Sequence, residues 1–205
     1  MFLNSCTPPS FTSKRILLAS NSPRRRELIA MILPEFEIPE PVDVNEVYPD
    51  GLAPEDVPVY LSRLKAQPYL GTLTDEDVLI TADTVVLSDG VLLGKPKDED
   101  DARRMLRSLS GRTHKVITGV SISSIGRMES FSEVTEVSFA ELSEYEIDEY
   151  VRRYNPMDKA GAYGIQEYIG AIGITGIRGC FYNVMGLPAG ALYHRLRHFL
   201  QADQK

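Results

Sequence analysis

The feature that most constrains this chain is a pair of short apolar runs, each of which gives way to polar residues. Residues 15–20 read RILLAS and residues 77–82 read DVLITA. Runs of this length and composition are typical of buried strands. Ser22-Pro23 follows the first run and predicts a helix start, with Ser22 as N-cap and Pro23 at the first helical position. The early chain therefore predicts strand–helix–strand units, the pattern of an α/β fold.

The middle of the chain predicts antiparallel pairing as well. Residues 113–125 and 129–139 alternate between apolar and polar side chains, and Gly126 lies between them. We interpret them as two long paired strands. Residues 36–44 alternate weakly and are a candidate edge strand. We therefore expect an α/β fold with a mixed, elongated and twisted sheet and flanking helices.

Polar residues indicate where several helices begin. Asp98 is expected to cap one helix, and Ser143 with Glu146 matches the capping-box pattern. The segments expected to be helical are residues 23–33, 54–69, 98–109, 143–154 and 188–200.

Length and composition indicate a single globular domain. The chain has 205 residues, of which 43% are hydrophobic and 25% charged, as in ordinary soluble proteins. It has no internal repeat and no segment that reads as an interdomain linker. We expect residues 1–14 to be a flexible leader and residues 15–205 to form one domain.

The net charge and the cysteine content exclude several classes of protein. A net charge of −7 does not favour general binding to nucleic acid. No segment approaches the ~20 apolar residues that span a membrane, and the residues before Lys14 lack the features of a secretory signal. Cys6 and Cys180 have no metal-ligand spacing, so we interpret both as free thiols. We expect a cytoplasmic protein without a nucleic-acid or membrane partner.

The first candidate for chemistry is the segment SNSPRRR, from Ser20 to Arg26. Free N–H groups at a helix start attract anions, and arginines add fixed positive charge. This combination suits a polyphosphate. The residues alone leave open the alternative that Ser22 only caps the helix and the arginines face water.

The second candidate is Asp83, which follows the apolar run 77–82. Ligands of open α/β sheets bind at the carboxyl ends of strands, where a carboxylate can hold a divalent metal or accept a proton from water. The alternative is a turn residue that bonds a backbone N–H. Lys65, Lys95 and Glu46 are similarly ambiguous, because each fits either a ligand contact or a solvated side chain.

The third candidate is the segment PMDKAGAYGIQ, which ends at Gln166. Its glycines allow a ligand to approach the backbone closely, and the amide of Gln166 can both donate to and accept from the edge of a base. The alternative is a structural turn whose glycines adopt positive φ.

Taken together, these segments resemble the Maf family. The motifs LLASNSPRRREL, ITADTVV, LGKPKDEDDARRMLRSLSGRTHKVITGV, PMDKAGAYGIQ and GCFYNVMGLP occur in the family's order and approximate spacing, over roughly residues 15–200. The resemblance implies a fold similar to the inosine-triphosphate pyrophosphatases, with two lobes around a cleft. It also implies a homodimer that hydrolyses nucleoside triphosphates to the monophosphate and pyrophosphate with a divalent cation, Mg²⁺ or Mn²⁺.

The resemblance assigns roles by motif position. Asp83 matches the proton acceptor, and Glu46 together with Asp83 matches the metal site. The residues matched to substrate binding or substrate choice are Arg24, Thr84, Gln166, Ser20, Lys65, Lys95 and Lys159. The form KAGAYGIQ resembles the branch that acts on dTTP and UTP, which implies pyrimidine substrates, with CTP and modified pyrimidine nucleotides as further candidates.

This chain departs from many relatives at two places. After Gln166 it reads EYIGAIG, where many relatives have a Gly-rich stretch directly after the Gln. Asn155 stands where a Glu before the Pro is common.

An alternative of another class is a nucleotide- or nucleic-acid-binding regulator of cell division or septum formation that performs no turnover. The acidic net charge argues against broad nucleic-acid binding. A carboxylate at a strand end, beside cationic groups, argues for chemistry.

Overall fold

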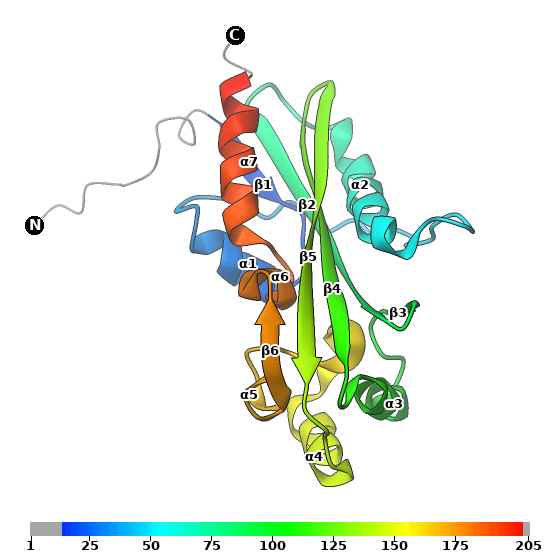
Figure 1. The fold of residues 1–205 in the computed structure, drawn as a ribbon. Coiled ribbons are helices and arrows are strands. Elements are labelled where there is room, and N and C mark those ends of the chain that lie inside the picture. Colours follow the sequence, from blue (N-terminus) through cyan, green and yellow to red (C-terminus); the bar gives the residue numbers. More distant parts are fainter. Residues whose placement is uncertain (1–13, 203–205) are drawn as a thin grey trace, which may run out of the picture.

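A single mixed sheet organises the part of the chain that the computed structural model describes, residues 14–202. Most of the expected leader, residues 1–13, lies outside this range. Strands β1 and β2 are parallel, and the other neighbours are antiparallel in the order β1-β2-β4-β5-β6, with β3 paired to β2 (Figure 1). The strands are β1 (Arg15–Leu18), β2 (Asp77–Ser88), β3 (Val91–Leu93), β4 (Thr113–Ser124), β5 (Arg127–Phe139) and β6 (Ile174–Arg178).

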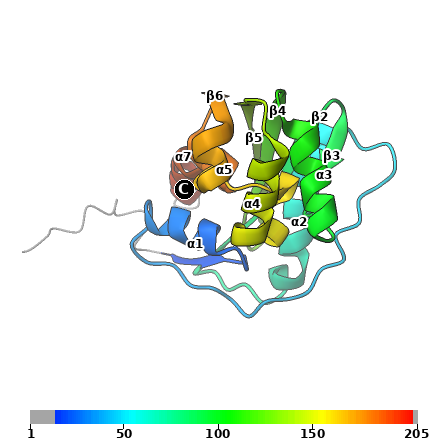
Figure 2. The ribbon, with the colours of Figure 1, turned by 90° about the horizontal axis from the view of Figure 1, so that it is seen from below.

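Helices cover both faces of the sheet, as Figures 1 and 2 show. Helix α2 packs on β2 and β4 from one side, while α1 and α7 lie on the other side near β1. Helices α3, α4 and α5 surround the opposite end of the sheet. The helices are α1 (Pro23–Ala30), α2 (Val57–Leu70), α3 (Glu99–Leu109), α4 (Glu144–Tyr154), α5 (Tyr168–Gly173), α6 (Phe181–Met185) and α7 (Ala189–Ala202), with short 3₁₀ turns η2 (Pro54–Asp56), η3 (Pro156–Asp158) and η4 (Ala160–Ala162).

Two separate hydrophobic cores on one face of the sheet create two lobes. The first core packs α1 and α7 against Ile80 and its neighbours, and the second packs α3, α4 and η4 against Val86. Strand β2 runs through both cores, because alternate side chains of a strand share one face. The expected α/β fold with two lobes is confirmed, and the boundary between the lobes falls on the middle of β2.

The middle of β2 has an open edge. Strand β1 pairs with β2 up to Ile80, and β3 pairs on the same edge only from Val86 onward. Residues 81–85 therefore lack a strand partner on that edge. On the other edge β4 pairs continuously from Leu79 to Leu87.

The continuous pairing with β4 corrects the expected position of Asp83. The sequence predicted that the strand ends at residue 82, because a carboxylate interrupts the apolar run. The strand instead continues to Ser88, and Asp83 lies at its middle, paired with Gly119. Asp83 nevertheless lies just beyond the carboxyl end of β1, because β1 stops at Leu18 beside Ile80.

Most of the expected helix starts are confirmed, with one exception. Asp98 accepts from the backbone N–H of Asp101, and Ser143 forms the full capping box. Ser22 occupies the N-cap of α1 and Pro23 begins the helix, as predicted, and only the cap hydrogen bond of the Ser22 hydroxyl is absent. The candidate edge strand at residues 36–44 is wrong, because only an isolated bridge between Leu17 and Glu37 forms there.

Two smaller expectations concern thiols and membranes. Cys180 is a free cysteine, as expected, and Cys6 lies outside the described range. Among residues 14–202 there is no helix with the length and apolar character to cross a membrane.

Gly119 sets how closely α2 approaches the sheet. A Cβ atom at Gly119 would lie 2.2 Å from the carbonyl carbon of Pro58, which belongs to the first turn of α2. A side chain there would collide with backbone that cannot rotate away. Because Gly119 is the cross-strand partner of Asp83, this close packing also fixes the distance between α2 and Asp83.

We predict that Gly119→Ala destabilises the fold by about 2 kcal/mol, because the added methyl group forces α2 outward. The urea midpoint of unfolding, followed by circular dichroism, measures the effect. Gly71→Ala is the matched control, since a Cβ at Gly71 meets nothing within 4 Å and its φ is −76°. Equal midpoints for Gly119→Ala and Gly71→Ala would contradict this packing.

Candidate functional site

The open edge of β2 borders a cavity of about 620 Å³ between the two lobes. Its walls come from the β1–α1 connection, the segment before α2, the middle of β2, and the segments around η3 and α6. Every residue to which the family resemblance assigned a role lines this cavity. These residues are Ser20, Arg24, Glu46, Lys65, Asp83, Thr84, Lys95, Lys159 and Gln166.

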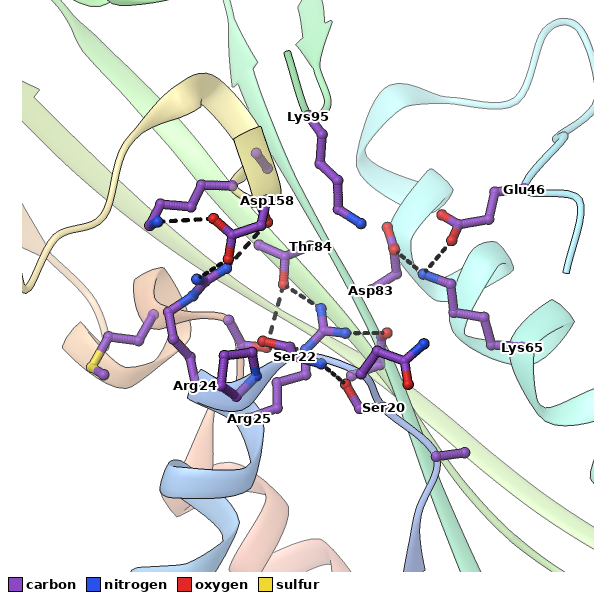
Figure 3. Close-up of a pocket in the computed structure, with 18 of the residues that line it drawn as sticks. Ser20, Ser22, Arg24, Arg25, Glu46, Lys65, Asp83, Thr84, Lys95 and Asp158 are labelled. Atoms are coloured by element: carbon purple, nitrogen blue, oxygen red, sulfur yellow. Dashed lines mark hydrogen bonds and ion pairs between the residues drawn. The ribbon is translucent and has the colours of Figure 1, made fainter. Parts of the chain in front are cut away.

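An ion-pair triad lies on one side of the cavity, opposite Arg24 and Asp158 (Figure 3). The ammonium of Lys65, on α2, lies 2.6 Å from Asp83 Oδ1 and 3.1 Å from Glu46 Oε1. The Asp83 side chain is only 11% exposed, whereas that of Glu46 is 47% exposed. A shielded carboxylate of this kind needs a counter-charge, and Lys65 provides it.

A long segment between α1 and α2 carries Glu46 to the cavity. This segment runs around the outside of the molecule in Figure 2. Tyr69 on α2 anchors it, because the Tyr69 hydroxyl donates to the carbonyl of Glu40 and accepts from the backbone N–H of Val42, both at 3.0 Å. The anchor lies a few residues before Glu46 and positions it beside Lys65.

The pair Asp83 and Glu46 fits one kind of metal site and not another. No group of three His, Cys, Asp or Glu side chains within residues 14–202 is arranged to hold a metal ion. A closed cage built only from protein ligands is therefore not available there. Mg²⁺ is usually held by one or two carboxylates together with substrate phosphates and waters. Asp83 and Glu46 fit a cation that is shared with a bound phosphate.

Arg25 has a structural role that the sequence alone did not distinguish from the roles of Arg24 and Arg26. Its guanidinium donates to the carbonyls of Ala82 and Gly186, each at 2.8 Å, and to the hydroxyl of Thr84 at 3.0 Å. Burial lowers the pKa of Arg25, and the nearby charge of Asp83 acts in the opposite direction. Arg25 thus links α1 to β2 and to the end of α6, and it lines the cavity.

Thr84 lines the cavity from the face of β2 opposite Asp83. Its hydroxyl bonds the hydroxyl of Thr118 at 2.9 Å in addition to Arg25. Adjacent residues of a strand point to opposite faces, and the cavity reaches both faces only because the edge of β2 is open.

Arg24 reaches across the cavity to the second lobe. It donates to the carboxylate of Asp158 at 2.6 Å and to the carbonyl of the same residue at 3.2 Å. The ammonium of Lys159 bonds the other carboxylate oxygen of Asp158 at 2.9 Å. Burial raises the pKa of Asp158, but the hydrogen bonds from Lys159 and Arg24 outweigh burial and lower it to about 2. Asp158 belongs to the motif PMDKAGAYGIQ, but the sequence predicted no role for this residue.

The remaining candidates are open to a ligand. Lys95 is exposed, extends into the cavity in Figure 3, and has no ion pair or hydrogen bond with the rest of residues 14–202. Gln166 is also exposed at the wall. At the start of α1, the hydroxyl of Ser22 is not used as a cap, and the Ser20 hydroxyl accepts from the Ser22 N–H at 3.3 Å. A helix start lined by hydroxyls and arginines can receive an anion.

The two-lobed mixed sheet, with a cation-lined cavity at a strand edge, defines an α/β protein with a Ham1-like fold. A solved structure of the Staphylococcus aureus Ham1 protein has a TM-score of 0.51 to this chain, covering 93% of this chain and 100% of that one at 16% identity. The chain belongs to the Maf family, because the family model described as Maf-like protein matches residues 15–199.

Curated relatives match nearly the whole chain. A dTTP/UTP pyrophosphatase of Phocaeicola vulgatus is 54% identical over 183 residues, which cover 89% of this chain and 95% of the relative. A dTTP/UTP pyrophosphatase of Porphyromonas gingivalis is 54% identical over 191 residues, which cover 92% and 96%. One from Parabacteroides distasonis is 47% identical over 185 residues, which cover 90% and 96%.

We predict that Arg25→Met destabilises the protein by about 3 kcal/mol, because acceptors that Arg25 satisfies lose their donor away from bulk water. Urea denaturation measures the change. Arg26→Met is the matched control, since Arg26 bonds a single carbonyl, that of Ser20, at 3.2 and 3.3 Å. A stability loss for Arg26→Met as large as that for Arg25→Met would contradict the special role of Arg25.

Proposed function

We propose that this protein hydrolyses dTTP and UTP to the monophosphate and pyrophosphate, and so removes these nucleotides from the pool. The observation that carries the proposal is the shielded carboxylate of Asp83, held by Lys65 at an open strand edge inside a cation-lined cavity. The curated relatives with this name, at 47–54% identity over most of the chain, support the same reaction.

The cavity suits a nucleoside triphosphate in size and charge. Small-molecule sites occupy about 300–1,000 Å³, and this cavity measures about 620 Å³. Lys65, Lys95, Arg24 and Lys159 lie around it and can neutralise a polyphosphate.

Asp83 acts as the proton acceptor in this proposal. Lys65 bonds Oδ1 of Asp83, which leaves Oδ2 to accept the proton of a water as it attacks the α-phosphorus. The new bond joins the water oxygen to the α-phosphorus, and the bond from that phosphorus to the bridging oxygen breaks. Pyrophosphate leaves with the bridging oxygen.

Asp83 and Glu46 would hold Mg²⁺ or Mn²⁺ together with the phosphates, and the cation would neutralise charge and activate the water. Arg24, Lys65 and Lys95 stabilise the negative charge that develops on the leaving pyrophosphate. These cations come from α1, from α2 and from the segment after β3, and all three line the same cavity.

Gln166 selects the base in this proposal. The edge of uracil or thymine offers both an acceptor and a donor, and an amide side chain can match both. A base that leaves such a group unpaired binds less well. CTP and modified pyrimidine nucleotides are the further candidate substrates.

The family resemblance also leads us to propose that the protein works as a homodimer in the cytoplasm. Light scattering coupled to size-exclusion chromatography measures the mass of the particle. A particle with the mass of one chain would contradict the dimer.

The reaction is tested with dTTP, UTP, CTP, ATP and GTP in the presence of Mn²⁺. Phosphate release in the presence of added inorganic pyrophosphatase measures turnover. We expect turnover of dTTP and UTP above the purines, and a fall in kcat of about a thousandfold in Asp83→Asn, because the amide cannot accept the proton.

Asp89→Asn is the matched control, since Asp89 lies in the β2–β3 turn and pairs with Arg112. It should retain the activity of the wild type. Unchanged activity in a folded Asp83→Asn variant would contradict the assigned base. Nucleotide binding without turnover in the wild type would instead favour a regulatory protein.

A further inference from the structure

Glu167 stands directly after Gln166. Its carboxylate lies behind the cavity wall, and its side chain is 19% exposed. One oxygen lies 3.1 Å from the ammonium of Lys159, and the other accepts from the hydroxyl of Tyr150. Both oxygens of this recessed carboxylate are therefore engaged.

Tyr150 connects Glu167 to the loop that carries Gln166. The hydroxyl of Tyr150, which lies on α4 and is fully buried, also accepts from the backbone N–H of Gly164 at 3.0 Å. Burial, and then the hydrogen bond to Glu167, raise the pKa of Tyr150, so the hydroxyl keeps its proton and donates it. The backbone N–H of Glu167 further donates to the carbonyl of Gly164 at 3.0 Å. The loop is thus tied on both sides of Gln166.

Lys159 depends on Glu167 for its position. Lys159 is 7% exposed, and its ammonium contacts Asp158 on the cavity side and Glu167 on the inner side. The contact with Asp158 is a hydrogen bond and the contact with Glu167 is an ion pair, so the ammonium of Lys159 is held from both sides. Asp158 also binds Arg24, so Glu167 is the partner that Lys159 does not share with another cation of the cavity wall.

The position of the Glu167 carboxylate is not explained by capping of helix α5. Glu167 occupies the N-cap position of α5, but its side chain makes no cap hydrogen bond. The carboxylate points instead to Lys159 and Tyr150.

We propose that Glu167, supported by Tyr150, is a positioning residue for nucleotide binding. It holds the ammonium of Lys159 toward the polyphosphate and the amide of Gln166 toward the base, and it does not touch the substrate itself. This inference rests on the proposed function. Since Lys159 and Gln166 act in binding, Glu167 affects KM and leaves the chemical step unchanged.

The test uses Glu167→Gln, which keeps the size of the side chain and an acceptor for Tyr150 but removes the charge. With UTP and Mn²⁺ we expect KM to rise about tenfold and kcat to change less than about twofold, the pattern of lost uniform binding. Lys159→Met should raise KM at least as much. The double variant should match Lys159→Met in KM, because Glu167→Gln keeps the acceptor for Tyr150 that ties the Gln166 loop and so acts on binding only through Lys159.

Two further variants separate positioning from general instability. Tyr150→Phe should raise KM in the same direction, because Gly164 and Glu167 lose their common partner. Glu144→Gln is the matched control, since it breaks an exposed ion pair with Arg107 far from Lys159, and it should leave KM unchanged. Urea midpoints for each variant establish that the proteins compared are folded.

An unchanged KM in Glu167→Gln, a loss confined to kcat, or additive effects in the double variant would each overturn the inference. The dissociation constant of a UTP analogue with an imido group between the α- and β-phosphorus atoms is measured for the same proteins. A wild type that binds this analogue without hydrolysing UTP contradicts the proposed function alone, and the binding ratios still decide the role of Glu167. A wild type that does not bind it overturns both.

Discussion

The site depends on one ion pair, between Lys65 and Asp83, at a place where strand β2 has no neighbour on one of its two edges. Strands β1 and β3 occupy the two ends of the same edge of β2 and leave residues 81–85 open. A carboxylate in the middle of a buried strand costs free energy unless it is paired, and Lys65 at 2.6 Å provides the partner. The close contact of α2 with Gly119 keeps that lysine in place.

The two lobes supply different parts of the site, and β2 holds them in register. The first lobe provides the start of α1 with Arg24, and the second provides Asp158 and Lys159. Arg24 and Asp158 join across the cavity, so an entering polyphosphate competes with Asp158 for Arg24. In the second lobe, Glu167 forms an ion pair with Lys159 on the side away from the cavity, and the hydroxyl of Tyr150 donates to Glu167.

Local patterns in the sequence predicted most of the strands and helix starts. The family resemblance, and not a local pattern, identified the residues that line the cavity. Local patterns failed where contacts between distant parts of the chain determine the structure. Asp83 interrupts an apolar run and imitates a strand end, but pairing with β4 carries the strand onward. The tie between Arg24 and Asp158 joins residues 134 positions apart, and no local pattern signals it. The positive φ of Asn155, which ends α4, does have a local signal, because Asn tolerates that conformation better than Glu.

The central claim is that water attacks the α-phosphorus of a nucleotide held beside Asp83. Hydrolysis of UTP in water labelled with oxygen-18, followed by mass spectrometry of the products, tests it most directly. We expect uridine monophosphate that carries the label and pyrophosphate that does not. Label in the pyrophosphate, or formation of uridine diphosphate and phosphate, would contradict it.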